Sequence, residues 1–117
     1  MKSPVSIVKD DQIATICIDN PPVNALSQPV RQGLLDCVDR ASSDPSIKII
    51  VLICSGRTFI AGADIKEFGK PPLKPFLPDV LTALDQCDKP IIAALHGTAL
   101  GGGLETALAC RYRIANS

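Results

Sequence analysis

The pattern of hydrophobic and polar positions near the start of the chain predicts two short strands. Residues 5–8 and 12–18 are short segments rich in β-branched side chains, which is typical of strands. Asp10 and Asp11 between them suit a hairpin turn. In residues 12–18 both alternating faces are mostly apolar, so we expect this strand to be covered on both sides. The pattern therefore predicts a hairpin, which an Asn-Pro-Pro stop then ends.

A helical pattern follows the two prolines. Ser27 suits the N-cap position, Pro29 falls in the first turn, and Asp44-Pro45 ends the pattern. Between these limits apolar residues recur at helical spacing, with charged residues elsewhere around the helix. We interpret this amphipathic helix as structural. The residues expected on its inward face are Val30, Leu34, Cys37, Val38 and Ala41.

Two later apolar runs, residues 47–53 and 91–95, have the composition of strands buried on both faces. Between them, the proline-rich residues 69–78 predict a surface loop, and residues 79–87 predict a helix. Residues 112–115 suit a further strand. Strands alternating with helices predict an α/β architecture with parallel strands. The second helix is expected to turn Val80, Leu81 and Leu84 inward.

Composition and charge then narrow the classes of function. The 117 residues carry 12 basic and 12 acidic side chains, which argues against nucleic acid or an anionic membrane as the main partner. No apolar stretch is long enough for a membrane-spanning helix, and the N-terminus lacks the apolar core of a signal peptide. The five cysteines form no C-x-x-C pair, which disfavours a zinc site. We expect reduced thiols in a cytoplasmic protein, without membrane insertion.

The strongest chemical signal lies between the apolar run 91–95 and residues 106–110, which suit a helix. Three adjacent glycines, at 101–103, form the turn, and Glu105 falls in the first helical turn. Main-chain N–H groups at such a turn can hold a developing oxyanion beside a carboxylate base. In the alternative interpretation, Glu105 only pairs with the helix dipole. The sequence around these glycines matches neither the glycine pattern of phosphate-binding loops nor that of dinucleotide-binding folds.

A second turn of the same shape follows the strand predicted at residues 47–53. Ala61, Gly62 and Ala63 are small enough for close approach to the backbone, and Asp64 suits a helix N-cap. Each turn joins a buried strand to a helix start. Two such turns in neighbouring layers can aim two backbone N–H groups at one point.

These turns together resemble the enoyl-CoA hydratase/isomerase (crotonase) family. The first reads Phe-Ile-Ala-Gly-Ala-Asp-Ile-Lys-Glu at 59–67, and the second reads His-Gly-Thr-Ala-Leu-Gly-Gly-Gly-Leu-Glu at 96–105. Asn-Pro-Pro-Val-Asn-Ala-Leu at 20–26 matches the opening segment of the family. The resemblance covers essentially the whole chain. It implies a crotonase-like spiral of ββα units, with residues 1–117 forming the N-terminal half of one domain, truncated before its C-terminal half.

The resemblance also implies roles for individual residues. The backbone N–H groups of Ala63 and Gly102 would form an oxyanion hole for the thioester oxygen of an acyl-CoA. Glu105 would be the general acid/base, and no metal is implied. Family hydratases also have a second catalytic glutamate in a later Pro-Glu segment, which lies beyond Ser117. The residues implied to bind substrate are Val23, Ala25, Leu26, Ala61, Gly62, Asp64, Ile65 and Gly101.

The implied activity is hydration of trans-2-enoyl-CoA in fatty-acid β-oxidation, with no cofactor at this step. Residues 68–73 and Cys110-Arg111 are most similar to the hydratase/isomerase module at the front of bifunctional enzymes. In those enzymes a 3-hydroxyacyl-CoA dehydrogenase follows, and NAD would be needed only there. The alternatives are an enoyl-CoA delta isomerase, another crotonase chemistry and a non-catalytic acyl-CoA-binding module. A trimer-type homo-oligomer is implied for a single-function protein, and a monomer for a bifunctional one.

Overall fold

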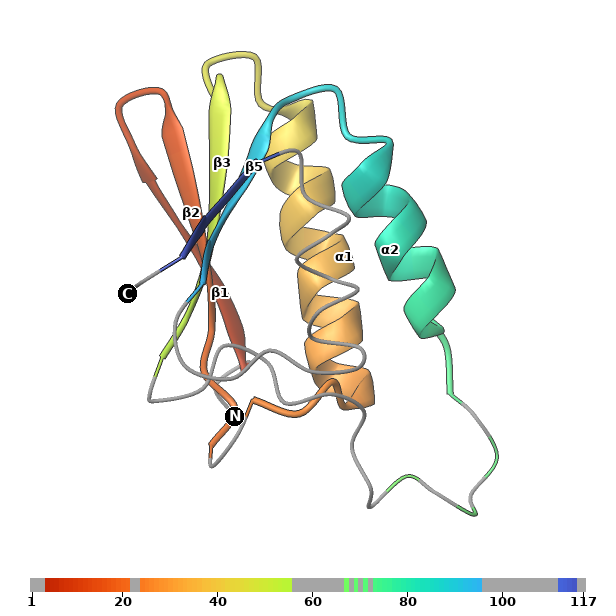
Figure 1. Ribbon diagram of the computed structural model, residues 1–117. Helices are drawn as coiled ribbons and strands as arrows, with labels where there is room; N and C mark the ends of the chain where they lie inside the picture. Colours follow the sequence, from red (N-terminus) through yellow and green to blue (C-terminus); the bar gives the residue numbers. More distant parts are fainter. Residues whose placement is uncertain are drawn as a thin grey trace.

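The computed structural model describes residues 4–21, 24–55, 67, 69, 71, 73–95 and 112–115. These residues form a five-stranded sheet with two helices on one of its faces (Figure 1). The alternation of strands and helices predicted from the sequence is therefore confirmed. In chain order the elements are β1 (Val5–Asp10), β2 (Ile13–Ile18), α1 (Gln28–Ser43), β3 (Ile49–Cys54), α2 (Leu77–Asp85), β4 (Ile91–Leu95) and β5 (Tyr112–Ala115).

The strands lie in the order in which they occur along the chain. β1 and β2 form the predicted hairpin, with Val5 opposite Ile18, and β2 to β5 are parallel neighbours. Asp11 in the hairpin turn has φ 57°, a left-handed conformation that aspartate tolerates better than most residues. Parallel neighbours need a crossover connection, and α1 provides it between β2 and β3 and α2 between β3 and β4.

The face of α1 predicted to be buried is the face that packs on the sheet. All five predicted inward residues of α1 are buried, and Leu34 is completely covered. The helix ends where expected, and Lys89 donates from Nζ to the carbonyl oxygens of Ala41 and Asp44. A lysine at this position satisfies terminal carbonyls and complements the negative end of the helix dipole.

Several predicted boundaries differ from the structure by two residues, and the starts of β3 and α2 are the clearest cases. β3 begins at Ile49, after the predicted start of that strand, and α2 begins at Leu77, before the predicted start of that helix. The sequence assigned Pro78 to a loop, but proline is tolerated in the first helical turn because its missing N–H needs no partner there. The carboxylate of Asp79 accepts a hydrogen bond from the N–H of Phe76 at 3.2 Å, which fixes this helix start.

The prediction that β2 and β3 are buried on both faces is wrong for the described residues. Ile16 and Ile18 face the helices and are buried, whereas Ile13 on the other face is 42% exposed. On β3, Val51 and Ile53 are only half-buried. Both described helices lie on the same face of the sheet, and no described element lies across the opposite face.

The described cysteines fit the expectation of reduced thiols. Cys17, Cys37, Cys54 and Cys87 are all free, and Cys110 lies outside the described residues. Burial raises the pKa of the thiols of Cys37 and Cys54, because the thiolate form loses its hydration. Among the helices in the described part of the chain, none is long and apolar enough to cross a membrane.

Candidate functional site

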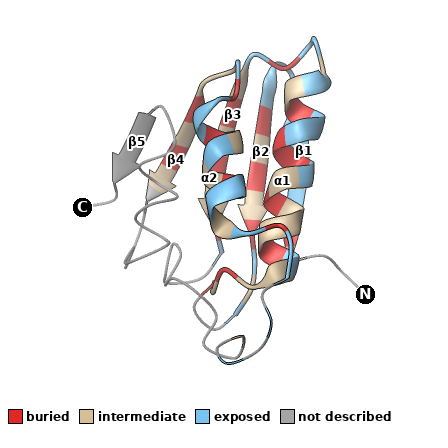
Figure 2. Cartoon of the chain, turned by 90° about the vertical axis from the view of Figure 1, so that its right-hand side faces the viewer, coloured by how far each residue is buried: buried red, intermediate tan, exposed pale blue. Residues whose placement is uncertain are grey.

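The carboxyl ends of parallel strands meet at one edge of the sheet. β2 and β3 run side by side with Ile18 opposite Cys54, and the arrowheads of β2 and β4 point to the same edge (Figure 2). Residues 20–26, 59–67 and 96–105 follow β2, β3 and β4 respectively. Ligands of open α/β sheets bind outside the carboxyl ends of the strands. This edge is therefore the candidate site.

Only part of the predicted site can be located. Ala25 and Leu26 are described, and both lie in the segment that follows β2. The roles of the other predicted residues stay predictions. Those lying outside the described residues are Val23, Ala61, Gly62, Ala63, Asp64, Ile65, Gly101, Gly102 and Glu105.

Asn24 fastens the segment after β2 to the end of β3. Asn24 is 2% exposed, and its φ of 54° is a left-handed value that asparagine adopts more readily than most residues. Asn24 Nδ2 donates to the carbonyl oxygen of Ser55 at 2.8 Å, and Asn24 Oδ1 accepts from the N–H of Asn20 at 2.8 Å. Sequence reasoning used Asn24 only as part of a motif, although the Pro-Pro stop before it signals a constrained turn.

The two described substrate-binding candidates differ in what they can offer a ligand. Leu26 is 1% exposed and belongs to the hydrophobic core. Ala25 is half-buried, and its carbonyl oxygen accepts from Asn20 Nδ2 at 2.9 Å. The side chain of Leu26 therefore contributes to packing of the core. The side chain of Ala25 is the more accessible of the two.

A polar cluster of Gln28, Arg31 and Glu67 occupies the N-terminus of α1. Glu67 Oε2 accepts from the N–H of Gln28 at 2.7 Å, and Glu67 Oε1 accepts from Arg31 Nη1 at 3.0 Å. Ser27 is the N-cap residue, as predicted, but its side chain makes no capping hydrogen bond. Glu67 supplies the anionic partner that the helix N-terminus favours. Sequence reasoning missed this cluster because its members are far apart along the chain.

The remaining donors of Arg31 reach three backbone carbonyls. Nη1 also donates to Leu26 at 2.7 Å, Nε donates to Pro75 at 2.8 Å, and Nη2 donates to Leu73 at 3.1 Å. The Arg31 side chain is only 11% exposed. One side chain therefore joins the segment after β2, the carboxylate of Glu67 and the proline-rich loop before α2.

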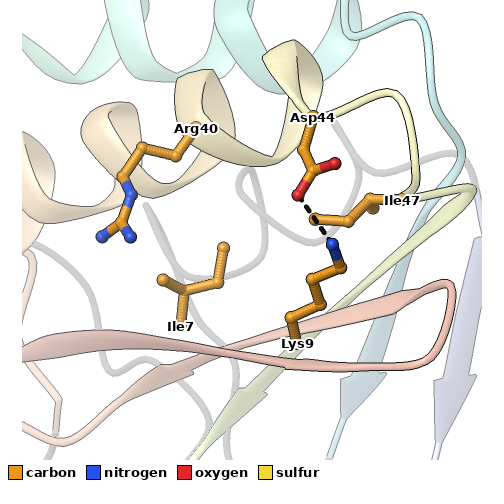
Figure 3. A pocket seen from close by; sticks show the side chains of 5 residues that line it. All are labelled: Ile7, Lys9, Arg40, Asp44 and Ile47. Carbon is orange, nitrogen blue, oxygen red and sulfur yellow. Dashed lines mark hydrogen bonds and ion pairs between the residues drawn. The ribbon is translucent and has the colours of Figure 1, made fainter.

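A separate cavity lies at the C-terminal end of α1. It has a volume of about 160 Å³ and is lined by residues of β1, α1 and the turn before β3 (Figure 3). Lys9 Nζ contacts Asp44 Oδ2 at 3.1 Å across it. Asp44 Oδ1 also accepts from the N–H and the hydroxyl of Ser46, at 2.9 and 2.7 Å. This end of α1 lies away from the candidate site. The lining residues are Ile7, Lys9, Arg40, Asp44 and Ile47.

The lowered pKa of Asp44 leads to a prediction about the stability of the folded protein at low pH. The hydrogen bonds from Ser46, followed by that from Lys9, lower the pKa of Asp44 to about 2. A carboxyl whose pKa is lowered by folding stabilises the folded state above its unfolded pKa, and this contribution is lost as the pH falls through the folded pKa. We expect Asp44→Asn to flatten the decline in stability between about pH 4 and about pH 2.

Urea midpoints measured across this pH range in the natural-length protein would test the prediction. Asp39→Asn is the matched control, because Asp39 is an exposed carboxylate on the same helix. A decline with Asp44→Asn as steep as in the wild type would contradict the assignment.

No set of three or more histidine, cysteine, aspartate or glutamate side chains is placed to hold a metal ion within the described ranges. At the candidate site, the described residues contribute hydrogen bonds and packing. Asn24 and Arg31 fix backbone segments, and Ala25 offers a small accessible side chain beside them.

Comparison with known protein families gives one model that matches residues 9–117, described as enoyl-CoA hydratase/isomerase. A peroxisomal bifunctional enzyme of Danio rerio is 46% identical over 104 residues, covering 89% of this chain and 14% of that protein. A probable enoyl-CoA hydratase of Bacillus subtilis is 42% identical over 118 residues, covering 95% of this chain and 46% of that protein. The chain thus spans less than half the length of these curated relatives.

Solved structures agree with the predicted crotonase-like fold. Pseudomonas aeruginosa DspI superimposes with a TM-score of 0.89 at 31% identity, covering 98% of this chain and 50% of that one. An enoyl-CoA hydratase of Bacillus anthracis gives 0.87 at 27% identity, covering 96% and 47%. The described sheet and helices therefore form part of a fold shared with enoyl-CoA hydratases, and the crotonase-like fold class is confirmed.

Proposed function

Because the chain belongs to the enoyl-CoA hydratase/isomerase family, we propose that the natural-length protein hydrates trans-2-enoyl-CoA thioesters in fatty-acid β-oxidation. The observation that carries this proposal is the family match over residues 9–117, which includes both glycine-containing turns. The sheet edge supports it, since the three motif segments each follow one of three adjacent parallel strands. The substrate is an acyl-CoA thioester, and the step needs no cofactor.

In the proposed mechanism, the backbone N–H groups of Ala63 and Gly102 donate hydrogen bonds to the thioester oxygen. Addition of water to the double bond places negative charge on that oxygen in an enolate-like transition state. Donors already aimed at this oxygen stabilise the charge without reorganising during the reaction. The loss of one such donor typically lowers kcat by about 10²- to 10³-fold, so this contribution is large.

Glu105 is proposed to move the proton. The water oxygen bonds to the β-carbon as one water O–H bond breaks, and the α-carbon accepts a proton, giving 3-hydroxyacyl-CoA. A carboxylate beside these carbons can act as base toward the water or as acid toward the α-carbon, and Glu105 would share the two proton transfers with the second catalytic glutamate that the family resemblance implies. The product contains every atom of water and substrate, so this step needs no oxidant or reductant.

Similarity to bifunctional enzymes supports a finer proposal. The relative from Danio rerio and a 41% identical human one are both named peroxisomal bifunctional enzymes. We propose that this module is followed by an NAD-dependent 3-hydroxyacyl-CoA dehydrogenase, which would oxidise the hydration product. NAD would then serve that second module alone. The expected oligomeric state and the cytoplasmic location stay predictions.

The delta isomerase is the second candidate, because the matching family is described as both hydratase and isomerase. Mass analysis of products from 2-enoyl-CoA and 3-enoyl-CoA separates the two reactions. Hydration adds the mass of one water molecule to the 2-enoyl substrate, whereas isomerisation of the 3-enoyl substrate leaves its mass unchanged. We expect a hydrated product from 2-enoyl-CoA. Isomerised 3-enoyl-CoA without any hydrated product would overturn the hydratase assignment.

A further inference from the structure

We propose that Arg31 is a positioning residue for the reaction, acting through Glu67 and the backbone around Leu26. The described contacts of Arg31 are with the carboxylate of Glu67 and with the backbone carbonyls of Leu26, Leu73 and Pro75. Its effect would pass through the segments that it joins. The inference rests on the proposed function, because it concerns the placement of the groups that would bind and polarise the thioester.

The largely covered guanidinium of Arg31 reaches acceptors on four residues. Arg31 donates to one carboxylate and to the carbonyl oxygens of Leu26, Leu73 and Pro75, with distances between 2.7 and 3.1 Å. At 11% exposure the guanidinium has little water to replace a lost partner. The planar fork of arginine matches several fixed acceptors at once, which the single ammonium of a lysine cannot do.

The residues held by Asn24, Gln28 and Arg31 flank the segment that contains Ala63. Asn24 holds the carbonyl of Ser55, directly before residues 56–66, and Arg31 and Gln28 hold Glu67, directly after them. Residues 56–66 include Ala63, the proposed oxyanion-hole donor. Both fixed points are contacted from residues 24–31, which also contain the substrate-binding candidates Ala25 and Leu26. The chain on both sides of the proposed donor is therefore anchored to one short stretch.

Donors of an oxyanion hole are sensitive to small changes in their position. An N–H group stabilises the transition state only when it lies about 3 Å from the developing oxyanion. A misplacement of about 1 Å by a distant substitution can cost about 10²-fold in rate. A change at Arg31 should thus lower kcat more than it raises KM, because the lost interaction is strongest in the transition state.

The test compares Arg31→Met, Arg31→Lys and Glu67→Ala in the natural-length protein with 2-enoyl-CoA. We expect each to lower kcat by about tenfold to about 10²-fold with KM changed by less than about threefold. If Arg31 acts through Glu67, the fold-decrease in kcat of the double variant Arg31→Met/Glu67→Ala should be smaller than the product of the fold-decreases of the two single variants. Lysine should restore only part of the arginine rate.

Asp44→Asn is the matched control, because it removes an ion pair of similar length from the other end of the same helix. It should leave kcat unchanged. Backbone hydrogen exchange in residues 56–66 supplies a readout that does not require turnover. It should accelerate in the Arg31 and Glu67 variants and stay at the wild-type rate in Asp44→Asn. If Arg31→Met fails to fold, Glu67→Ala carries the comparison, since Glu67 is 33% exposed.

The outcomes separate the two proposals. Normal kcat and unchanged exchange in the Arg31 and Glu67 variants would overturn the positioning role while leaving the hydratase assignment intact. A wild-type protein without turnover would overturn the hydratase assignment. In that case faster exchange confined to the Arg31 and Glu67 variants would still support the anchoring of residues 56–66, and exchange equal to that of the control would overturn it.

Discussion

Replacing Glu105 with glutamine is expected to lower the kcat for 2-enoyl-CoA hydration by about 10²- to 10⁴-fold. Glutamine has nearly the shape of glutamate but can neither take a proton from water nor return one to the α-carbon. Binding of acyl-CoA should persist, because the proposed oxyanion donors are backbone N–H groups that the substitution leaves in place. The effect should therefore appear in kcat and leave the dissociation constant for the substrate close to its wild-type value.

Steady-state kinetics and equilibrium binding of a non-reactive acyl-CoA, both in the natural-length protein, would measure the two effects separately. Asp39→Asn removes a carboxylate from the exposed side of α1 and serves as the control for a general effect of charge. Turnover of the Glu105→Gln protein near the wild-type rate would remove Glu105 as acid/base. Loss of binding together with kcat would instead indicate that the substitution disturbs the fold.

Leu34→Ala is expected to cost about 2–5 kcal/mol of unfolding free energy. Leu34 is completely buried on the face of α1 that packs on the sheet, so truncation leaves a cavity as well as lost apolar contact. Natural domains are stable by only about 5–15 kcal/mol, so this one change would remove a large share of the total. Urea unfolding of the natural-length protein measures the loss directly.

The adjacent Leu35→Ala variant is the matched control, because Leu35 is chemically identical, lies on the same helix and is only half-buried. Its loss should be clearly smaller than that of Leu34→Ala. Equal losses at the two positions would mean that α1 does not pack on the sheet through the face containing Leu34.

The described fold could be predicted best where the signal is local. The spacing of apolar residues in α1 identifies all of its buried positions, because helical periodicity links sequence to one face directly. The hairpin follows from β-branched segments around Asp10 and Asp11. The sequence predicts too late a start for α2 because Pro78 counts toward the proline-rich loop, although proline is tolerated in a first turn.

Long-range arrangements could not be predicted in the same way. The residues of β2 are mostly apolar on both faces of the strand, so the sequence alone does not show that the face containing Ile13 is only partly covered. The contact between Arg31 and Glu67 depends on tertiary packing and has no local signature. The candidate site itself came from motifs, and Asn24 gained a specific structural role only through its bond to Ser55.

The most direct test of the central claim is the initial loss of enoyl-thioester absorbance when the natural-length protein meets a short-chain 2-enoyl-CoA. We expect the rate of absorbance loss to saturate with substrate, with a kcat in the usual enzyme range of about 1–10³ s⁻¹. Absence of any loss, with acyl-CoA binding retained, would contradict the hydratase assignment.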